Sequence, residues 1–282
     1  MSDSHASNGM LAVVTGASSG IGEAFARQLA ARGYNLLLVA RREDRLRAVA
    51  AAIAAEHGVP RGVRVETVAA DLASDEGRDR VASRIRAASD LALLVNNAGF
   101  GTVGIFYETD LEQQDQMHRL HVLTTLALTH AALENLTAQA GRPGPCGIIN
   151  VSSVASFGQS PSNVSYCATK AWMTSFTEGL AIELVTKQSP VRLQALCPGF
   201  TYSEFHDRMG VDRNPIPKQL WMTADFVVAE SLRGFDRGQV VVVPGWRYKI
   251  IVAFIKAMPG PLMRRIAAVG ARRYRKPIEA KP

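Results

Sequence analysis

Short, almost continuously apolar runs alternate with longer amphipathic stretches along most of this chain. A strand of a parallel sheet that is covered on both faces has such an apolar run, and the stretches between have the spacing of covering helices. The pattern predicts an α/β fold in three layers, with a doubly wound parallel sheet of about seven strands. The expected strands are residues 10–15, 36–40, 63–70, 91–96, 147–152, 191–197 and 240–243.

Helices are expected between these strands, and residues after a strand are the first places to look for a site, because ligands bind at the carboxyl ends of such sheets. The predicted helices are residues 20–32, 44–57, 74–88, 111–138, 163–187 and 223–235. We expect a disordered N-terminus (1–9), one main domain (10–245) and a helical C-terminal extension (246–282).

Composition narrows the classes of protein. The 282 residues, 47% of them apolar, suffice for a full core, and no run reaches the roughly 18 apolar residues of a membrane span. The polar start lacks the apolar region of a secretory signal. Cys146, Cys167 and Cys197 are too widely spaced to indicate a disulfide framework or a zinc site, so we expect no metal and a cytoplasmic location.

The net charge of +7 is concentrated in residues 246–282, which hold ten Lys/Arg and one Glu. The rest is nearly neutral and gives no reason to expect nucleic acid. Within this tail, residues 248–258 and 262–274 each combine apolar and basic side chains, as an interfacial helix on the inner face of an anionic membrane does. Packing against the body or a partner subunit fits equally well and is the preferred interpretation.

The first predicted strand leads directly into Thr-Gly-Ala-Ser-Ser-Gly-Ile-Gly at residues 15–22. Glycines allow a tight turn close to a pyrophosphate, and the following helix offers unpaired amides and the positive end of its dipole. An ordinary glycine-rich turn is the alternative. The candidate cofactor-binding residues here are Gly16, Ser18, Ser19, Gly20, Ile21 and Gly22.

After the second predicted strand the chain has Arg41 and Arg42, where an NAD site commonly has a carboxylate for the ribose 2′-hydroxyl. A guanidinium suits a 2′-phosphate instead. The sequence therefore favours NADP(H) over NAD(H), unless both arginines are simply solvated loop residues.

Tyr166 and Lys170 lie at positions i and i+4 of a predicted helix, so they share one face. A cation fixed near a phenol favours the phenolate, and we expect it to lower the pKa of Tyr166 from about 10. Ser153 lies 13 residues upstream, at the end of the fifth predicted strand, where its hydroxyl could hold a carbonyl oxygen. The three residues together suggest proton exchange with a carbonyl or alcohol.

In order and spacing these motifs resemble the classical short-chain dehydrogenase/reductase family, of the bacterial type with a basic C-terminal extension. The resemblance covers residues 11–244 and includes Asp71-Leu72, the sequence Asn-Asn-Ala-Gly at 96–99, and Pro198-Gly199. It implies a Rossmann fold and a homodimer or homotetramer formed through residues 111–138 and 163–187.

The resemblance also implies roles for single residues. Asp71 would meet the adenine amino group with Leu72 packed beside the base, and Asn97 and Ala98 would border the ribose. The other implied cofactor contacts are Gly99, Tyr166, Lys170, Pro198, Gly199 and Thr201, with Ser203 a weaker candidate. Each could instead be a turn or cap residue.

His121 departs from the family pattern, because an asparagine usually occupies its position, 24 residues after Asn97. Its main-chain carbonyl could serve the same proton relay, or the imidazole could join the relay near pH 7. It could also be an ordinary helix residue. We prefer a structural replacement and keep His121 as a candidate catalytic residue beside Ser153, Tyr166 and Lys170.

The expected reaction is hydride transfer between a nicotinamide cofactor and a carbonyl or carbinol carbon. An aromatic-rich segment after the sixth strand predicts a lid over an apolar pocket for a lipophilic substrate, unless its side chains form a small core of their own. The residues that suggest this are Phe200, Tyr202, Phe205, Met209, Trp221 and Met222. A dinucleotide-binding sensor or scaffold, or a peripheral membrane protein working through its tail, are the rival interpretations.

Overall fold

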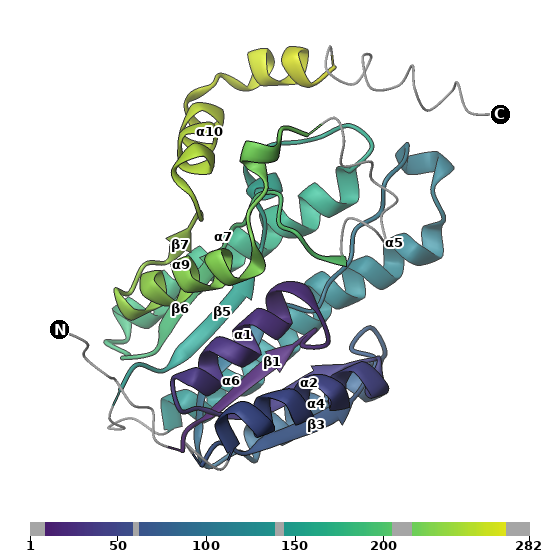
Figure 1. Cartoon of the computed structure of the whole chain (residues 1–282). Helices are drawn as coiled ribbons and strands as arrows, with labels where there is room; N and C mark the ends of the chain where they lie inside the picture. Colours follow the sequence, from purple (N-terminus) through teal and green to yellow (C-terminus); the bar gives the residue numbers. More distant parts are fainter. Residues whose placement is uncertain (1–8, 59–61, 139–143, 205–215, 269–282) are drawn as a thin grey trace.

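The computed structural model describes residues 9–58, 62–138, 144–204 and 216–268. It confirms the predicted architecture: seven parallel strands form one sheet in the order β3-β2-β1-β4-β5-β6-β7, with helices on both faces (Figure 1). The strands are β1 (Leu11–Thr15), β2 (Asn35–Ala40), β3 (Val65–Ala69), β4 (Leu91–Asn96), β5 (Gly147–Val151), β6 (Arg192–Leu196) and β7 (Val241–Val242).

Most predicted helices are present with shifts of a residue or two at their ends. They are α1 (Gly20–Ala31), α2 (Glu43–Ile53), α4 (Asp75–Arg86), α5 (Leu111–His118), α6 (Thr124–Ala138), α7 (Val164–Thr186), α9 (Ala224–Asp236) and α10 (Trp246–Ala257). Side chains cap three of them: Ser74, Asp110 and Thr223 each accept a hydrogen bond from a first-turn amide. Such caps explain why these helices begin where they do.

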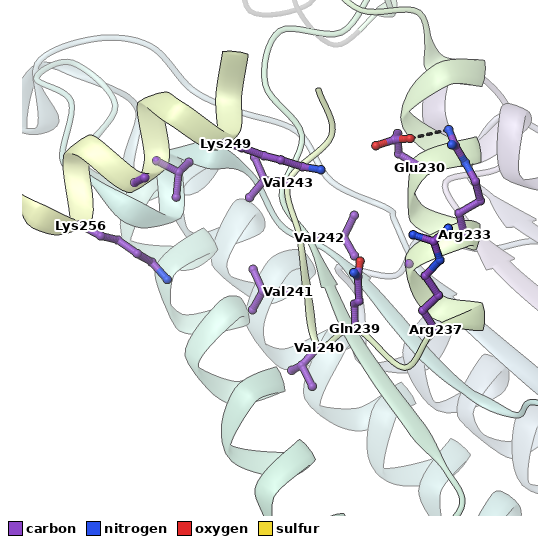
Figure 2. Close-up of a pocket in the computed structure, with 13 residues that line it drawn as sticks. Glu230, Arg233, Arg237, Gln239, Val240, Val241, Val242, Val243, Lys249 and Lys256 are labelled. Atoms are coloured by element: carbon purple, nitrogen blue, oxygen red, sulfur yellow. Dashed lines mark ion pairs between the residues drawn. The ribbon is translucent and has the colours of Figure 1, made fainter. Parts of the chain in front are cut away.

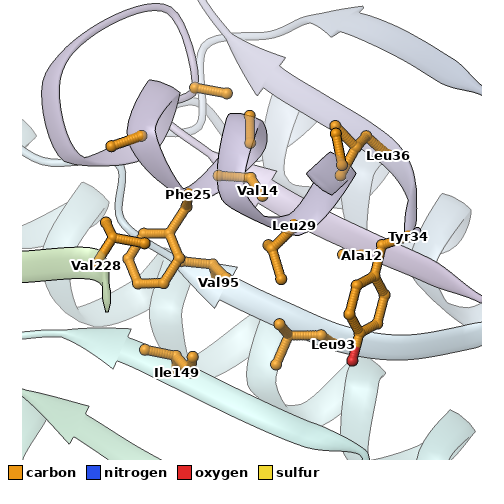
Figure 3. Close-up of a cluster of buried hydrophobic side chains, with 14 of the residues drawn as sticks. Ala12, Val14, Phe25, Leu29, Tyr34, Leu36, Leu93, Val95, Ile149 and Val228 are labelled. Carbon is orange, nitrogen blue, oxygen red and sulfur yellow. The ribbon is translucent and has the colours of Figure 1, made fainter. Parts of the chain in front are cut away.

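The sheet is buried on both sides because alternate strand residues face opposite layers. In β1, Ala12 and Val14 pack with α1, α2 and α9 (Figure 3), whereas Leu11 and Val13 pack with α4 and α6. All residues of β1, β2, β4 and β5 are buried. The near-continuous apolar runs of the sequence are therefore explained by two cores, one on each face.

The predicted helix over residues 111–138 is not continuous. The π-helical turn η3 (Arg119–Leu123) separates α5 from α6, and its residue His121 is fully buried. Such a turn accommodates one extra residue and changes which side chains face inward, and it often marks a functional site. The predicted helix 44–57 likewise ends at Ile53 and continues as the π-helical turn η1 (Ala54–Gly58).

The strand order reverses between β1 and β4, which places the expected ligand crevice at their carboxyl ends. The parallel register brings the ends of neighbouring strands level, with Asn96 opposite Asn150 and Val151 opposite Leu196. The glycine motif, the Asn-Asn-Ala-Gly segment, Ser153 and Pro198-Gly199 all follow these strand ends. They consequently gather at one edge of the sheet.

The C-terminal extension begins with α10 and continues with helical residues 260–268 (Figure 1). The remainder of the predicted helix 262–274 lies outside the described residues, as do residues 1–8 of the predicted disordered N-terminus. Within the part of the chain that is described, no helix is both long and apolar enough to cross a membrane.

Candidate active site

The glycine motif forms the turn between β1 and α1. Gly16 has a φ of +65° and Gly20 a φ of +58°, both in the left-handed region that favours glycine. A Cβ on Gly22 would lie 2.3 Å from the carbonyl oxygen of Gly16, so the third glycine allows helix and turn to pack closely. The N-cap Ser19 makes no side-chain cap hydrogen bond. This helix start suits the pyrophosphate of a dinucleotide, which its amides could hold.

Asn97 and Ala98 lie directly beside this turn. The Asn97 side-chain amide donates to the carbonyl oxygens of Thr15 (2.9 Å) and Gly16 (3.3 Å). The Thr15 hydroxyl oxygen accepts from the backbone amides of Asn97 and Ala98 and donates to the Val95 carbonyl. The Asn97 side chain thus fixes the loop after β4 to the glycine motif.

Arg41 and Arg42 differ in what they contact. Arg41 is 55% exposed and approaches Asp71 at 3.9 Å, which leaves most of its guanidinium open to solvent. Arg42 donates to the hydroxyls of Ser18 and Ser19, at 3.2 and 3.0 Å, and forms an ion pair with Glu204.

The remaining predicted adenine-side residues have structural contacts as well. The Asp71 carboxylate accepts from the Ala73 amide at 3.0 Å, a turn hydrogen bond, besides its contact with Arg41. Leu72 is buried, and its carbonyl accepts from the Thr124 hydroxyl. Glu204 was missed by sequence reasoning, because its partners, Arg42 and Arg45, lie about 160 residues earlier in the chain.

Ser153, Tyr166 and Lys170 come together at the end of β5. Ser153 follows the strand and forms a hydrogen bond with the phenol of Tyr166, which lies in the first turn of α7. Lys170, one turn further, donates from Nζ to the carbonyl oxygen of Val151 at 2.8 Å, and this Nζ lies 5.8 Å from the Tyr166 ring centroid. The geometry unites the three residues that the sequence singled out.

The expected pKa relationship between Tyr166 and Lys170 is wrong for the protein without cofactor. Burial raises the pKa of Tyr166 to about 12, although the hydrogen bond with Ser153 opposes this. Burial also lowers the pKa of Lys170 to about 7, so its ammonium is not permanently charged. Desolvation is the largest cause of both shifts. Tyr166 is consequently a protonated phenol at neutral pH, the state that a general acid requires.

His121 lies in contact with this cluster. Its Nδ1 is 2.9 Å from the hydroxyl of Thr169, which itself donates to the Tyr166 carbonyl. Since the hydroxyl proton is used there, Nδ1 carries the proton of the imidazole and Nε2 is an acceptor. The ring meets that of Tyr166 edge-on at 5.9 Å. Burial, with the nearby Lys170 and His118, holds the pKa of His121 well below its usual 6.5.

The position of the His121 ring explains why the Asn-Asn-Ala-Gly segment ends in glycine. A Cβ on Gly99 would lie 2.6 Å from Nε2 of His121, so only glycine leaves room for the ring. The Nε2 atom is buried, and no atom of the described residues forms a hydrogen bond with it. His121 is thus part of the packing around Tyr166, in line with the preferred structural interpretation, and a charged relay through it near pH 7 is not supported.

Two predicted cofactor contacts, Thr201 and Ser203, lie in the loop after β6 and have different surroundings. Thr201 is buried, and its hydroxyl donates to the Gly199 carbonyl at 3.0 Å. Ser203 lies against the glycine motif, where a Cβ on Gly20 would be 2.9 Å from the Ser203 Cβ. Ser203, the weaker candidate in the sequence, therefore lies against the turn expected to hold the pyrophosphate, whereas the Thr201 hydroxyl is bonded within its own loop.

The aromatic side chains of the predicted lid that are described form one cluster. Trp221 stacks on Tyr202 at 4.9 Å between ring centroids and lies 5.4 Å from Phe200. Phe205 and Met209 lie outside the described residues. Tyr202 is 45% exposed whereas Trp221 is buried, so the cluster has an inner and an outer side.

A separate groove of about 620 Å³ lies at the β7 edge of the sheet, between α9 and α10 (Figure 2). Among the described residues, it is lined by valines 240–243, by the basic residues Arg233, Arg237, Lys249 and Lys256, and by one carboxylate, that of Glu230. None of the predicted site residues lines it. It is distinct from the cluster around Tyr166.

The sheet order, the glycine turn and the Ser153–Tyr166–Lys170 cluster together define a dinucleotide-dependent oxidoreductase. Comparison with known proteins agrees, since residues 10–214 match the family described as short chain dehydrogenase. An uncharacterized oxidoreductase of Bacillus subtilis (YmfI) is 31% identical over 246 residues, which are 83% of this chain and 97% of that protein. The chain belongs to the short-chain dehydrogenase/reductase family and is an NAD(P)-dependent oxidoreductase.

Two solved structures extend the comparison. A short-chain dehydrogenase from Sphingobium yanoikuyae in complex with NADPH has a TM-score of 0.77 and 30% identity, with 89% of this chain and 97% of that chain covered. The bulky-bulky ketone specific alcohol dehydrogenase from Comamonas testosteroni has a TM-score of 0.74 and 28% identity, covering 90% and 96%.

The lowered pKa of Lys170 predicts that this residue destabilises the cofactor-free fold. The unfolded chain keeps the Lys170 proton up to about pH 10.5, whereas the folded chain releases it near pH 7. Because the unfolded state binds more protons between these values, wild-type stability should rise with pH across this window relative to Lys170→Met. The variant should be more stable by roughly 1–4 kcal/mol near pH 7, and this advantage should shrink towards pH 10.

Urea unfolding of both proteins at several pH values measures this difference. Lys187→Met, at the exposed end of α7, is the control and should change stability little at any pH. A stability difference between wild type and Lys170→Met that does not vary with pH would contradict the assignment.

Proposed function

We propose that this protein is an NADP(H)-dependent oxidoreductase that interconverts a ketone or aldehyde and an alcohol, with Tyr166 as the general acid/base. The observation that carries this proposal is the cluster of Ser153, Tyr166 and Lys170 at the carboxyl end of the sheet, beside the glycine motif. The nicotinamide, when bound, supplies the hydride. The protein must then hold the carbonyl and exchange one proton with its oxygen.

The described contacts suggest how these residues share the work. The Tyr166 phenol is protonated at neutral pH and can donate to an oxygen that gains negative charge. Ser153 can hydrogen-bond the same oxygen and keep it within reach of the phenol. Lys170, with a pKa of about 7, would charge readily when a polar ligand covers it, and its charge would stabilise the tyrosinate after transfer. In the oxidation of an alcohol the proton moves in the opposite direction.

Tyr166→Phe should lower kcat by about 10²- to 10⁴-fold, because it removes the proton donor and leaves the ring. The Kd for NADPH, measured by fluorescence titration, should stay within about twofold. Tyr107→Phe, at an exposed tyrosine, is the control. An unchanged rate in Tyr166→Phe would refute the acid/base role, and tight NADPH binding without turnover of any ketone or aldehyde would favour the sensor interpretation.

The preference for NADP(H) rests on Arg41, which is exposed beside Asp71 at the end of β2. No carboxylate occupies its position, and a guanidinium can hold a 2′-phosphate with two hydrogen bonds. The NADPH complex of the Sphingobium yanoikuyae relative is consistent with this assignment.

Arg41→Ala should raise the Kd for NADPH about 10- to 100-fold and leave the Kd for NADH almost unchanged, since only NADPH has the 2′-phosphate. Titration of both cofactors at equal ionic strength measures the two constants. Arg47→Ala is a matched control, because Arg47 is exposed on α2 and pairs with Glu43. Equal weakening of both cofactors by Arg41→Ala would contradict the proposal.

A lipophilic carbonyl substrate is supported by the cluster of Phe200, Tyr202 and Trp221 after β6. Phe200 and Tyr202 follow β6 in the loop whose Pro198 carbonyl accepts from the Val154 amide, next to Ser153. The Comamonas testosteroni relative is specific for bulky ketones, which agrees with an aromatic side of the substrate site formed by these three rings.

Assembly into a homodimer or homotetramer is supported by apolar side chains exposed on the helices that the family resemblance assigns to the interface. Several of these side chains are more than two-fifths exposed in the single chain: Leu111, Leu123, Leu126, Val164, Ile182 and Val185. Such faces usually pair with a second copy. A mass of one chain by light scattering at micromolar concentration would contradict this assembly.

A second candidate function, contact with an anionic membrane, is favoured by the outer face of α10. Trp246, Ile250 and Phe254 recur every four residues and are 60–66% exposed. The basic residues Arg247 and Lys249 lie beside this apolar stripe, as in an interfacial helix.

The protein should float with vesicles that contain phosphatidylglycerol, less so at high salt, and not with neutral phosphatidylcholine vesicles. Ile250→Ser with Phe254→Ser should reduce the floated fraction severalfold, because it removes apolar area from the outer face. Equal flotation of this double variant and the wild type would rule out contact through α10.

A further inference from the structure

The first helix of the C-terminal extension, α10, buries the side chain of one tyrosine against the body of the protein. Tyr248 is 5% exposed, whereas its neighbours Trp246 and Ile250 are largely exposed. Its hydroxyl oxygen accepts from the backbone amide of Phe200 at 2.9 Å and donates to the carbonyl of Leu220 at 2.8 Å. One phenol therefore joins both ends of the segment that carries the aromatic cluster.

The same two ends are joined by backbone contacts. The Met222 amide donates to the Phe200 carbonyl, and the Tyr202 amide donates to the Met222 carbonyl, each at 2.9 Å. These bonds bring residues 200–202 alongside Met222. To this clasp the Tyr248 hydroxyl adds a side-chain link between the same two ends of the segment, through the Phe200 amide and the Leu220 carbonyl.

The Tyr248 ring also fits closely over Gly199. A Cβ at residue 199 would lie 2.0 Å from the ring carbon Cζ, so the absence of a side chain there is required for the helix to dock. Gly199 belongs to the Pro-Gly pair that the family resemblance places beside the nicotinamide. Sequence reasoning attributed this glycine to the cofactor, and the structure adds the tail helix as a second reason.

A short chain of contacts connects this clasp to the catalytic serine. The Val154 amide, directly after Ser153, donates to the Pro198 carbonyl at 3.0 Å. Val154 begins the 3₁₀ turn η4 (Val154–Phe157). The other end of this turn contacts α10, since Nζ of Lys256 lies 4.8 Å from the Phe157 ring centroid. The helix α10 therefore contacts both the loop after β6 and the turn η4 that follows Ser153.

We propose that Tyr248 is a positioning residue of the active site, which holds the substrate wall of Phe200, Tyr202 and Trp221 at a fixed distance from Ser153 and Tyr166. The inference rests on the proposed carbonyl reduction. In this proposal the helix α10 is a structural part of the substrate site, because it holds this wall in place. The Tyr248 phenol suits this role because burial raises its pKa, which keeps its proton available for Leu220.

Tyr248→Phe tests the proposal, since it keeps the ring over Gly199 and removes both hydrogen bonds. With a phenyl ketone that reaches the wall, KM should rise about 5- to 20-fold while kcat changes less than about threefold. With acetone, which does not reach the wall, KM should change less than about twofold. The Kd for NADPH should stay within about twofold, because the glycine turn is not touched.

Hydrogen exchange gives a readout that does not depend on turnover. The Phe200 amide should exchange at least about tenfold faster in Tyr248→Phe, because its acceptor is lost. If the wild type reduces no carbonyl, the proposed function fails, and this exchange measurement still decides whether the clasp exists. If the wild type is active and Tyr248→Phe has unchanged KM values and amide protection, the positioning role is overturned.

Two variants separate positioning from simple packing. Tyr34→Phe removes the hydroxyl of an equally buried tyrosine at the opposite end of the sheet, and it should leave KM unchanged. Val252→Ala loosens the other buried contact of α10 but keeps both Tyr248 hydrogen bonds. A rise in KM with Val252→Ala as large as that with Tyr248→Phe would overturn the proposal, because loss of packing alone would then explain the effect.

Discussion

The close approach between the β1–α1 turn and the loop after β4 is the constraint on which the rest of the site depends. The backbone is packed so closely here that a side chain would not fit at Gly16 or Gly22. The side-chain amide of Asn97 donates hydrogen bonds to the carbonyl oxygens of the turn. The strand order reverses at the same place, so the crevice and the tightest backbone packing coincide. A larger residue here would separate the loop from the turn and displace Ala98 and Gly99 with it.

Burial determines the chemistry of the cluster that this packing supports. In the protein without cofactor, desolvation keeps Tyr166 protonated and brings the pKa of Lys170 close to 7. At neutral pH Tyr166 therefore has a proton to donate, and Lys170 is close to its midpoint between the neutral and the charged form. The neutral His121 contributes differently, because its single imidazole proton is already used by Thr169. It holds the first turn of α7 without adding a charge next to the phenol.

The sequence was sufficient to predict the fold and to single out Ser153, Tyr166 and Lys170, which the structure brings together, because both predictions depend on local patterns. Apolar runs define the strands, and the i, i+4 spacing defines the pair Tyr166–Lys170. Features that depend on contacts distant in the sequence could not be predicted in this way. The π-helical turn at His121 contains no glycine or proline from which it could be predicted. The ion pair between Arg42 and Glu204 joins residues that are more than 160 positions apart in the sequence. The sign of the Tyr166 pKa shift also required the burial, which the spacing alone does not give.

The C-terminal helix shows the same limit in one element. Tyr248 and Val252 are four residues apart, and so are Trp246, Ile250 and Phe254, so spacing alone offers two equivalent apolar stripes. Of the two stripes, only that of Tyr248 and Val252 carries a hydroxyl, and this hydroxyl forms hydrogen bonds with the Phe200 amide and the Leu220 carbonyl. Docking by the Tyr248 stripe forms both of these bonds and seats the ring over Gly199, whereas the other stripe has no hydroxyl to form them. Hydrogen bonding therefore explains why the Tyr248 side of α10 faces the body, and why Trp246, Ile250 and Phe254 stay exposed on its other side.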